Sequence, residues 1–561
     1  MKLRHLHIQN FRGINNLELE LSNTNVLVGE NNSGKTAVLD ALRLSLRGVR
    51  SRRGCIFTAY DFHLSDSSSD PTTAPPIVIK LLFREDEAGE WDDELVARLN
   101  RIKIAQIDKN GLTSVIFKVD ARFDPVQQDF VQNWEFLNLD GAVLTNINDS
   151  AISILQNEVS YYYLAALRDA TKHFDPKGTY WRPFLKESEL TEENKNEIEK
   201  KLAEINELII SSHGSFDKVI EKLKEVQQVV PMKGGDNLVS VDAIPSRLFD
   251  MLERAQVNIN TGTGAKIPVA RHGEGTQSLA VLTLFNAFLQ SWNNGEPFVA
   301  LEEPESHLHP CAIRALWRLI ERIPGQKIIS THSGDLLSEV PPESIIRLYR
   351  KSNCVTSGRI KDAKLDQKKL RQFNYHIRTT RGELLFSRCW ILGEGESEVT
   401  LFPELARTAG NCIEKYGIRC IGYRQSDISL FIQVADAMGI HWIALTDNDG
   451  QGKSDQEKIR KALESRNGDV VHFSMPEDDI EQHLCVSGFS HVYESFLTKE
   501  SLANISANPT DPEYYSQLTK AVSKHKISAI HKVIEEIQGG AIAPELLMNT
   551  LKAAIRCAEI P

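Results

Sequence analysis

The chain has 561 residues, more than one hydrophobic core usually organises, so we expect two to four domains. Its composition, 41% hydrophobic and 25% charged, is that of a folded globular protein, and no apolar run is long enough for a transmembrane helix. The net charge of −11 counts mildly against a nucleic-acid partner, but it does not exclude one, because phosphate contact requires only a local basic surface.

Residues 1–8 alternate like a β-strand and lack the apolar core of a signal peptide. The eight cysteines include no C-x-x-C pair, which argues against a disulfide framework and against a structural zinc site. We therefore expect a cytoplasmic protein with no membrane partner.

The segment from Gly29 to Thr36 reads G-E-N-N-S-G-K-T and fits the phosphate-binding P-loop pattern, with a short apolar strand before it and a helical pattern after it. In such a loop the backbone N–H groups point at phosphate oxygens, the lysine supplies a cation, and the last hydroxyl holds Mg²⁺. The pattern predicts nucleotide binding by Gly29, Asn31, Asn32, Ser33, Gly34, Lys35 and Thr36.

Two amphipathic helices are predicted between about 185 and 232, with a break at 211–215. Apolar residues recur at helical spacing in both, at Ile198, Leu202, Ile205 and Ile209 and at Phe216, Ile220, Leu223 and Val226. Their apolar stripes need a partner, which leaves two interpretations open: a helical layer on its own domain, or a dimerisation arm.

Three later segments complete a nucleotide site. An apolar strand ends in Glu302, which would hold Mg²⁺, and Glu303, which would orient the attacking water. Another strand ends near His332, which would sense the γ-phosphate. A glycine-rich turn before a helix is an anion site and contains Gly273, Gly275 and Gln277.

Together these elements resemble the ABC ATPase head of SMC-like and RecF-like proteins. The resemblance implies ATP with one Mg²⁺ ion, and a head-to-head homodimer or a higher homo-oligomer in which the glycine-rich signature of one subunit closes on the nucleotide of another. It also places Arg12 near the nucleotide. Two features depart from the family pattern: the signature is not L-S-G-G-Q, and Glu302 stands where most ABC proteins have Asp. We therefore expect slow hydrolysis and ATP acting mainly as a switch.

A second acidic site is predicted after residue 388. The strand 390–393 ends in Glu394, a glycine turn brings Glu398 onto the first helical turn, and the strand 442–446 ends in Asp447 and Asp449. Because the carboxyl ends of parallel strands meet in one crevice, these carboxylates would converge and bind Mg²⁺ or Mn²⁺. A third acidic cluster, at 477–481, follows a strand predicted at 470–475.

This constellation resembles the Toprim domain of topoisomerases, primases and the OLD (overcoming lysogenization defect) family. The resemblance implies a two-ion metal site to which Asp479 and Glu481 also contribute, and a catalytic lysine in the C-terminal region, for which Lys526 is the first choice and Lys524 the second. The catalytic set would be Glu394, Glu398, Asp447, Asp449, Glu481 and Lys526, with Glu303 serving the ATPase.

The order of the two halves is that of OLD family nucleases, which the chain resembles over nearly its whole length. The implied architecture is a mixed α/β multidomain protein: an ABC head with a helical insertion, a Rossmann-like Toprim domain and a helical C-terminal tail. We expect the head at 1–180 and 236–380, the insertion at 181–235, the Toprim domain at 381–500 and the tail at 501–561.

The resemblance implies an ATP-gated, metal-dependent DNA endonuclease acting in anti-phage defence. A partner encoded nearby, such as a helicase-like protein or a retron reverse transcriptase with its nucleic acid, is also implied. Two alternatives stay open: a repair ATPase whose Toprim domain is only structural, and a scaffold that is active only with a partner. A topoisomerase or a primase is disfavoured, because the chain has no segment for a DNA-gate domain with a tyrosine nucleophile and no C-x-x-C pairs.

Overall fold

A computed structural model of the chain divides into two compact units. The first contains Met1–Tyr163, Asn294–Glu302 and Gly325–Pro561, and the second contains Leu164–Asn293 and Glu303–Pro324. The structure describes residues 1–47, 55–64, 66, 69–148, 150–165, 191–212, 214, 244–245, 248, 251, 258–260, 266–291, 296–352, 354–380, 382–424, 426–463, 471–505, 507–509 and 512–559.

The first unit begins with an antiparallel sheet in the order β2-β1-β4-β6-β5, and β7 pairs with β6. Its strands are β1 (Leu3–Phe11), β2 (Ile14–Glu20), β4 (Ile77–Arg84), β5 (Gln106–Ile107), β6 (Thr113–Asp124) and β7 (Asp129–Leu137). β4 alternates strictly between buried and partly exposed side chains along Ile77 to Phe83, so one face of the sheet packs into the core.

The second sheet of this unit carries the P-loop and has the order β14-β13-β3-β12-β11-β8. Its strands are β3 (Thr24–Val28), β8 (Val159–Leu164), β11 (Glu296–Glu302), β12 (Gln326–Ser330), β13 (Ile345–Lys351) and β14 (Cys354–Arg359). β11, β12, β3 and β13 are parallel, and α1 (Lys35–Arg47) follows β3 directly, as the P-loop pattern predicts. Parallel strands buried on both faces need continuous apolar runs, which β3 and β11 have.

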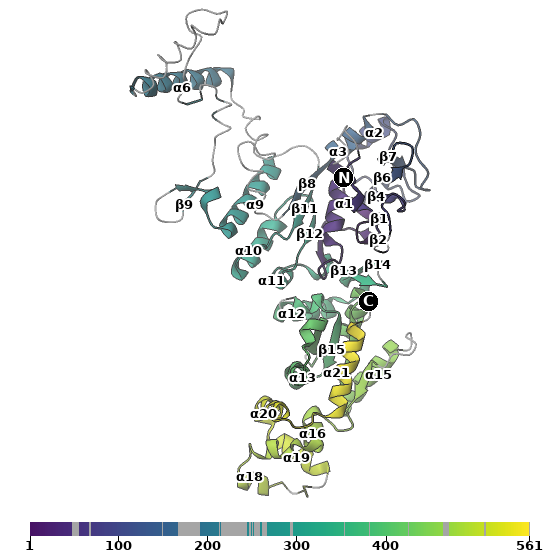
Figure 1. Cartoon of the computed structure of the whole chain (residues 1–561), viewed down its shortest axis with the longest axis vertical. Coiled ribbons are helices and arrows are strands. Elements are labelled where there is room, and N and C mark those ends of the chain that lie inside the picture. The colour runs from purple at the N-terminus through teal and green to yellow at the C-terminus, as the bar shows by residue number, and fades with distance from the viewer. Residues whose placement is uncertain are drawn as a thin grey trace, which may run out of the picture. The chain divides into compact units, whose positions relative to one another are not determined.

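The third sheet is fully parallel, with the order β16-β15-β17-β18. Its strands are β15 (Cys389–Gly393), β16 (Ile418–Gly422), β17 (His441–Thr446) and β18 (His472–Ser474). The last is shorter than the predicted 470–475. Helices α13 (Glu396–Thr408), α14 (Ile428–Met438) and α15 (Gly450–Leu463) alternate with the strands, which confirms the Rossmann-like Toprim arrangement (Figure 1).

The tail is helical, and its last helix α21 (Glu545–Ala558) packs back on β15 and β17. Helix α20 (Lys526–Gln538) packs on α13 through the stripe that includes Ile530, Val533 and Ile537. The remaining helices of the first unit are α2 (Asp93–Arg101), α3 (Ala151–Glu158), α11 (Gly334–Leu337), α12 (Gln367–Thr379), α16 (Ile480–Leu484), α17 (Ser490–Glu494), α18 (Lys499–Ala503) and α19 (Pro512–Ala521).

The second unit contains α6 (Glu192–Ser212), the hairpin of β9 (Asn258–Asn260) and β10 (Lys266–Pro268), and the packed pair α9 (Glu274–Ser291) and α10 (Pro310–Glu321). Helix α6 is the first of the two predicted amphipathic helices. On its apolar stripe Leu202 is buried, whereas Ile205 is 47% exposed. The second predicted helix, around Phe216 to Val226, lies outside the described residues. Among the described helices, none has the length and apolar character needed to cross a membrane.

Candidate functional site

The P-loop is shaped by its two glycines and closed by its lysine. Gly29 has φ 148°, and a Cβ there would lie 2.2 Å from the carbonyl oxygen of Leu348 on β13, so only glycine fits. Lys35 is buried, and its Nζ donates to the carbonyl oxygens of Gly29 and Glu30, each at 2.8 Å. The ammonium group therefore sits within the loop whose backbone would cradle the phosphates.

Glu302 joins the P-loop helix to a residue that sequence reasoning did not place in the site. Its Oε1 accepts from the hydroxyl of Thr36 at 2.7 Å, and its Oε2 accepts from the hydroxyl of Tyr163 on β8. Burial and the neighbouring carboxylate raise the pKa of Tyr163, so the phenol stays a donor. Tyr163 could be assigned only once the sheet order placed β8 beside β11.

The other nucleotide-site candidates lie at element ends. His332 comes two residues after Ser330, which is opposite Glu302 in the β11–β12 register. Glu303 has a positive φ of 43°, and the second compact unit resumes at this residue.

The glycine-rich turn and Arg12 lie on other elements. Gly273 immediately precedes α9, and Gly275 and Gln277 lie on its first turn, where Gln277 Nε2 donates to the carbonyl of His272 at 2.6 Å. Arg12 is tied to Asp40 on α1 at 2.5 Å and to Asp61 at 2.8 Å.

Two carboxylates face each other at the carboxyl edge of the Toprim sheet. Glu394 follows β15 and Asp447 follows β17, and these strands are neighbours. Glu394 Oε2 and Asp447 Oδ1 are both buried, and neither accepts a hydrogen bond from the residues that the structure describes. Burial, followed by the charges of Glu398 and Glu394, raises the pKa of Asp447 well above its ordinary value. A buried carboxylate pair of this kind requires a proton or a cation between its members.

Glu398 is the third carboxylate of this edge and is only 2% exposed. Its Oε2 accepts from the backbone N–H of Gly395 at 3.0 Å, which fixes the turn after β15. A Cβ at Gly393 would come within 2.6 Å of the Glu398 side chain, so glycine is needed for this approach. Burial raises the pKa of Glu398 to about 7.

Glu481 and Lys526 form the other side of the cluster. Glu481 is buried, its Oε1 accepts from the hydroxyl of Ser397 at 2.6 Å, and its Oε2 lies 2.8 Å from Lys526 Nζ. The charges of Glu481, Asp479 and Glu398 oppose the effect of burial, and the pKa of Lys526 is raised. Among the described contacts, Lys526 therefore makes an ion pair within the cluster. Ser397 was missed by sequence reasoning, although it stands between Glu396 and Glu398.

Two predicted ligands also serve as helix caps. Asp449 Oδ1 accepts from the N–H of Gly452 at 2.7 Å, and Asp479 Oδ1 accepts from the N–H of Gln482 at 2.8 Å. Each keeps lone pairs for a further partner.

The donor set fits a hard divalent cation, because it consists of carboxylate oxygens, two of which are buried without a donor. Within the part of the chain that the structure describes, no three acidic, His or Cys side chains are arranged around one point as ligands. The uncompensated pair of Glu394 and Asp447 is therefore the feature that favours a metal ion here.

The fold and this edge define a class of protein, an ABC-type ATPase head followed by a Toprim domain. Residues 1–383 match the family model described as "Protein of unknown function (DUF2813)". Residues 385–449 match the model described as "Overcoming lysogenization defect protein-like, TOPRIM domain". The chain belongs to the DUF2813 family and, with its head and Toprim domain in this order, to the OLD family.

Curated relatives span most of the chain. It is 29% identical to "Uncharacterized protein YbjD" of Escherichia coli (strain K12), with 88% of each chain covered. It is 23% identical to "Endonuclease GajA" of Bacillus cereus (strain VD045), covering 85% of this chain and 82% of that one. It is 24% identical to "OLD nuclease" of Thermus scotoductus (strain ATCC 700910 / SA-01), covering 91% and 93%.

Proposed function

We propose that this chain is a metal-dependent DNA endonuclease whose Toprim site hydrolyses phosphodiester bonds and whose ABC-type head binds ATP and controls that site. The observation that carries the proposal is the pair formed by Glu394 Oε2 and Asp447 Oδ1, two buried oxygens that have no hydrogen-bond donor among the described residues, at the tips of adjacent parallel strands. The names of two relatives, an endonuclease and a nuclease, support the reaction class.

The candidate ligands for two Mg²⁺ or Mn²⁺ ions are Glu394, Glu398, Asp447, Asp449, Asp479 and Glu481. When bound, such ions activate water and neutralise charge at the leaving 3′ oxygen of the scissile bond. Lys526 supplies a positive charge at the same edge, held in place by Glu481. Ser397 and Gly395 hold the side chains of Glu481 and Glu398 in position.

The head supplies the nucleotide site. Lys35 and Thr36 would contact the phosphates and the nucleotide's Mg²⁺, with Glu302 beside Thr36, Glu303 positioning the water and His332 sensing the γ-phosphate. Gly273, Gly275 and Gln277 would close on the nucleotide of a second subunit, in a homodimer or a higher homo-oligomer. A role in anti-phage defence, with a helicase-like or reverse-transcriptase partner, belongs to the same proposal.

The deciding experiment incubates supercoiled plasmid with purified protein and Mg²⁺, Mn²⁺ or EDTA, each with and without ATP. We expect metal-dependent nicking that Glu394→Ala and Asp447→Ala abolish while ATP binding persists. Glu457→Ala, an exposed acid on α15, is the matched control and should cleave normally. Cleavage in EDTA, or normal cleavage by the Asp447 variant, would contradict the proposal.

A further inference from the structure

The outward face of α12 carries a row of basic side chains that the proposed nuclease and ATPase sites do not use. Lys368, Arg371, Tyr375 and Arg378 are all exposed, Tyr375 by 53%. Their spacing of three, four and three residues places them on one side of the helix. We call these four residues the basic stripe.

The opposite face of α12 fixes the direction in which the basic stripe points. Phe373, His376 and Ile377 are buried, and the helix packs on α14 of the Toprim domain. His376 Nε2 lies 2.8 Å from Ser426 Oγ, and Lys369 Nζ donates to Gln433 Oε1 at 3.0 Å. The helix (α12 in Figure 1) is therefore anchored along its length, and the exposed side chains of the basic stripe lie on its other face.

The basic side chains of the stripe have no acidic partner among the described residues. Among the described contacts, Lys368, Arg371 and Arg378 form no ion pair, and the helix itself contains no acidic residue. The acid just before it, Asp366, is used as the N-cap and accepts from the N–H of Lys369 at 2.8 Å. An ordinary solvated helix face mixes both signs, because like charges three or four residues apart destabilise a helix. The positive charge of the stripe is also opposite in sign to the net charge of the chain, which is −11.

The C-terminal half of α12 is connected by hydrogen bonds to the backbone of Glu394. Ser426, which contacts His376, donates its backbone N–H to the carbonyl of Tyr423 at 2.7 Å. Arg424, the residue after Tyr423, donates its backbone N–H to the carbonyl of Glu394 at 2.8 Å. Two residues that are close in sequence, Arg424 and Ser426, therefore contact Glu394 and α12 respectively.

We propose that the basic stripe binds the phosphodiester backbone of duplex DNA and holds the duplex beside the Toprim site. This inference rests on the proposed function and adds the surface that captures the substrate. From Lys368 to Arg378 the helix rises about 15 Å, which matches about four base pairs of duplex. Lysine, arginine and tyrosine are common phosphate-contacting side chains, and such contacts position a protein without reading sequence.

The test measures binding of a fluorescent duplex by anisotropy in EDTA, which prevents cleavage, over a series of salt concentrations. For the triple variant K368Q/R371Q/R378Q we expect affinity at least about tenfold weaker and a log K against log salt slope shallower by about 2.7, since each lost phosphate contact removes about 0.9. The matched control K499Q/K520Q/K552Q removes three exposed lysines elsewhere and should keep the parental slope. The charge-conserving variant R371K/R378K should also keep the parental slope, which would show that the loss of charge, and not misfolding, makes the slope of the triple variant shallower.

A parental slope and affinity in the triple variant would overturn the inference, as would binding of the stripe to phosphatidylserine vesicles but not to DNA. The plasmid assay separates this outcome from failure of the proposed function. If the parent cleaves and the triple variant cleaves with the same salt dependence, only the DNA-binding stripe is refuted. If the stripe binds DNA but no metal supports cleavage, only the nuclease proposal is refuted.

Discussion

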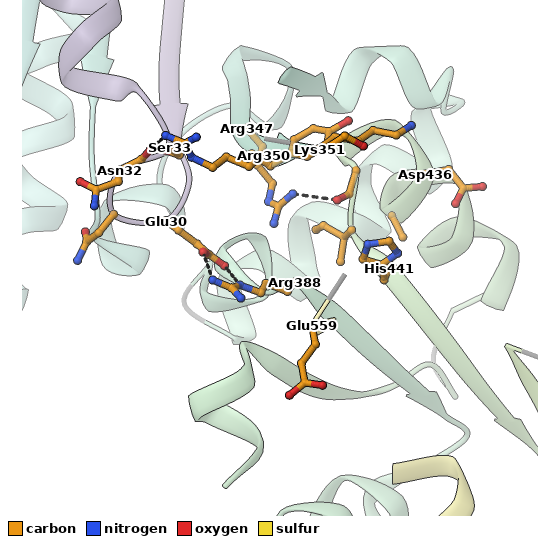
Figure 2. A pocket seen from close by; sticks show the side chains of 16 residues that line it. Glu30, Asn32, Ser33, Arg347, Arg350, Lys351, Arg388, Asp436, His441 and Glu559 are labelled. Carbon is orange, nitrogen blue, oxygen red and sulfur yellow. Dashed lines mark hydrogen bonds and ion pairs between the residues drawn. The ribbon is translucent and has the colours of Figure 1, made fainter. Parts of the chain in front are cut away.

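The carboxylate of Glu30 and the guanidinium of Arg388 form a two-point ion pair, with Nε–Oε1 and Nη2–Oε2 distances of 2.5 and 2.6 Å (Figure 2). Glu30 lies in the P-loop, and Arg388 directly precedes β15, whose other end leads to Glu394. Beside the pair, Arg347 of the head donates to the carbonyls of Leu385, Ser387, Met438 and Gly439. The nucleotide loop thus contacts the strand that carries the first Toprim carboxylate.

If ATP controls cleavage, the Glu30–Arg388 pair is a direct route for that control. We expect Arg388→Gln to bring the ratio of nicking rates with and without ATP close to one, while ATP affinity changes by no more than a few fold. The exposed pair stabilises the fold by about 1 kcal/mol or less, so folding should persist. Arg419→Gln, which breaks the comparably exposed pair with Glu383, is the control, and an unchanged ATP effect in Arg388→Gln would refute the route.

Asp447→Asn should stabilise the metal-free protein, because it removes the buried carboxylate that faces Glu394. We expect a gain on the order of 1–3 kcal/mol in EDTA at neutral pH, measured by chemical denaturation. The same change should abolish the rise in Tm that Mn²⁺ produces in the parent. A destabilised Asp447→Asn protein that still responds to Mn²⁺ would mean that the pair does not form the metal site.

The elevated pKa of Glu398 predicts how metal-free stability depends on pH. In the folded state this carboxyl keeps its proton up to about pH 7, whereas in the unfolded state it loses the proton near its ordinary value of 4.5. The folded state thus binds more protons in this window, and stability falls as pH rises through it. Relative to the parent, Glu398→Gln should gain up to about 3 kcal/mol between pH 4.5 and 8. If the pH profiles of unfolding free energy in EDTA ran parallel for the parent and Glu398→Gln, the raised pKa of Glu398 would be disproved.

Lys526→Ala should lower kcat for nicking by about 10²-fold, since it removes a positioned cation from the reacting edge. Lys524→Ala is the matched control, because among the described contacts the ion pair with Glu481 is made by Lys526 and none connects Lys524 with the cluster. Steady-state nicking of plasmid measures both variants. Equal loss in the two would indicate a structural effect on α20 instead of a role for one lysine.

Local patterns were enough to predict the P-loop, the acidic ends of β11, β15 and β17, and the parallel Toprim sheet, because each depends on a short segment and its flanking strand. Contacts set by sheet order could not be predicted. Tyr163 reaches Glu302 because β8 borders β11, and Ser397 reaches Glu481 across 84 residues.

The tail shows a similar limit. The spacing of apolar residues in the tail predicted helices. The packing of α21 against β15 and β17 depends on tertiary contacts that no local pattern contains. Asp449 was predicted from its position after a strand, and Asp479 from the family resemblance. Their capping bonds reflect the tendency of such side chains to satisfy nearby backbone N–H groups.

The pairing of β3 has a consequence for how the protein is made. The strand that leads into the P-loop bonds to β12 and β13, so Thr24 is opposite Lys327. At a synthesis rate of about 5–20 residues per second, the P-loop strand waits roughly 15–60 s for its neighbours. A fragment that ends before β12 would leave this strand without its parallel partners. Nucleotide binding should therefore arise late in synthesis, shortly before β15 is made, and nascent chains shorter than this should not retain ATP.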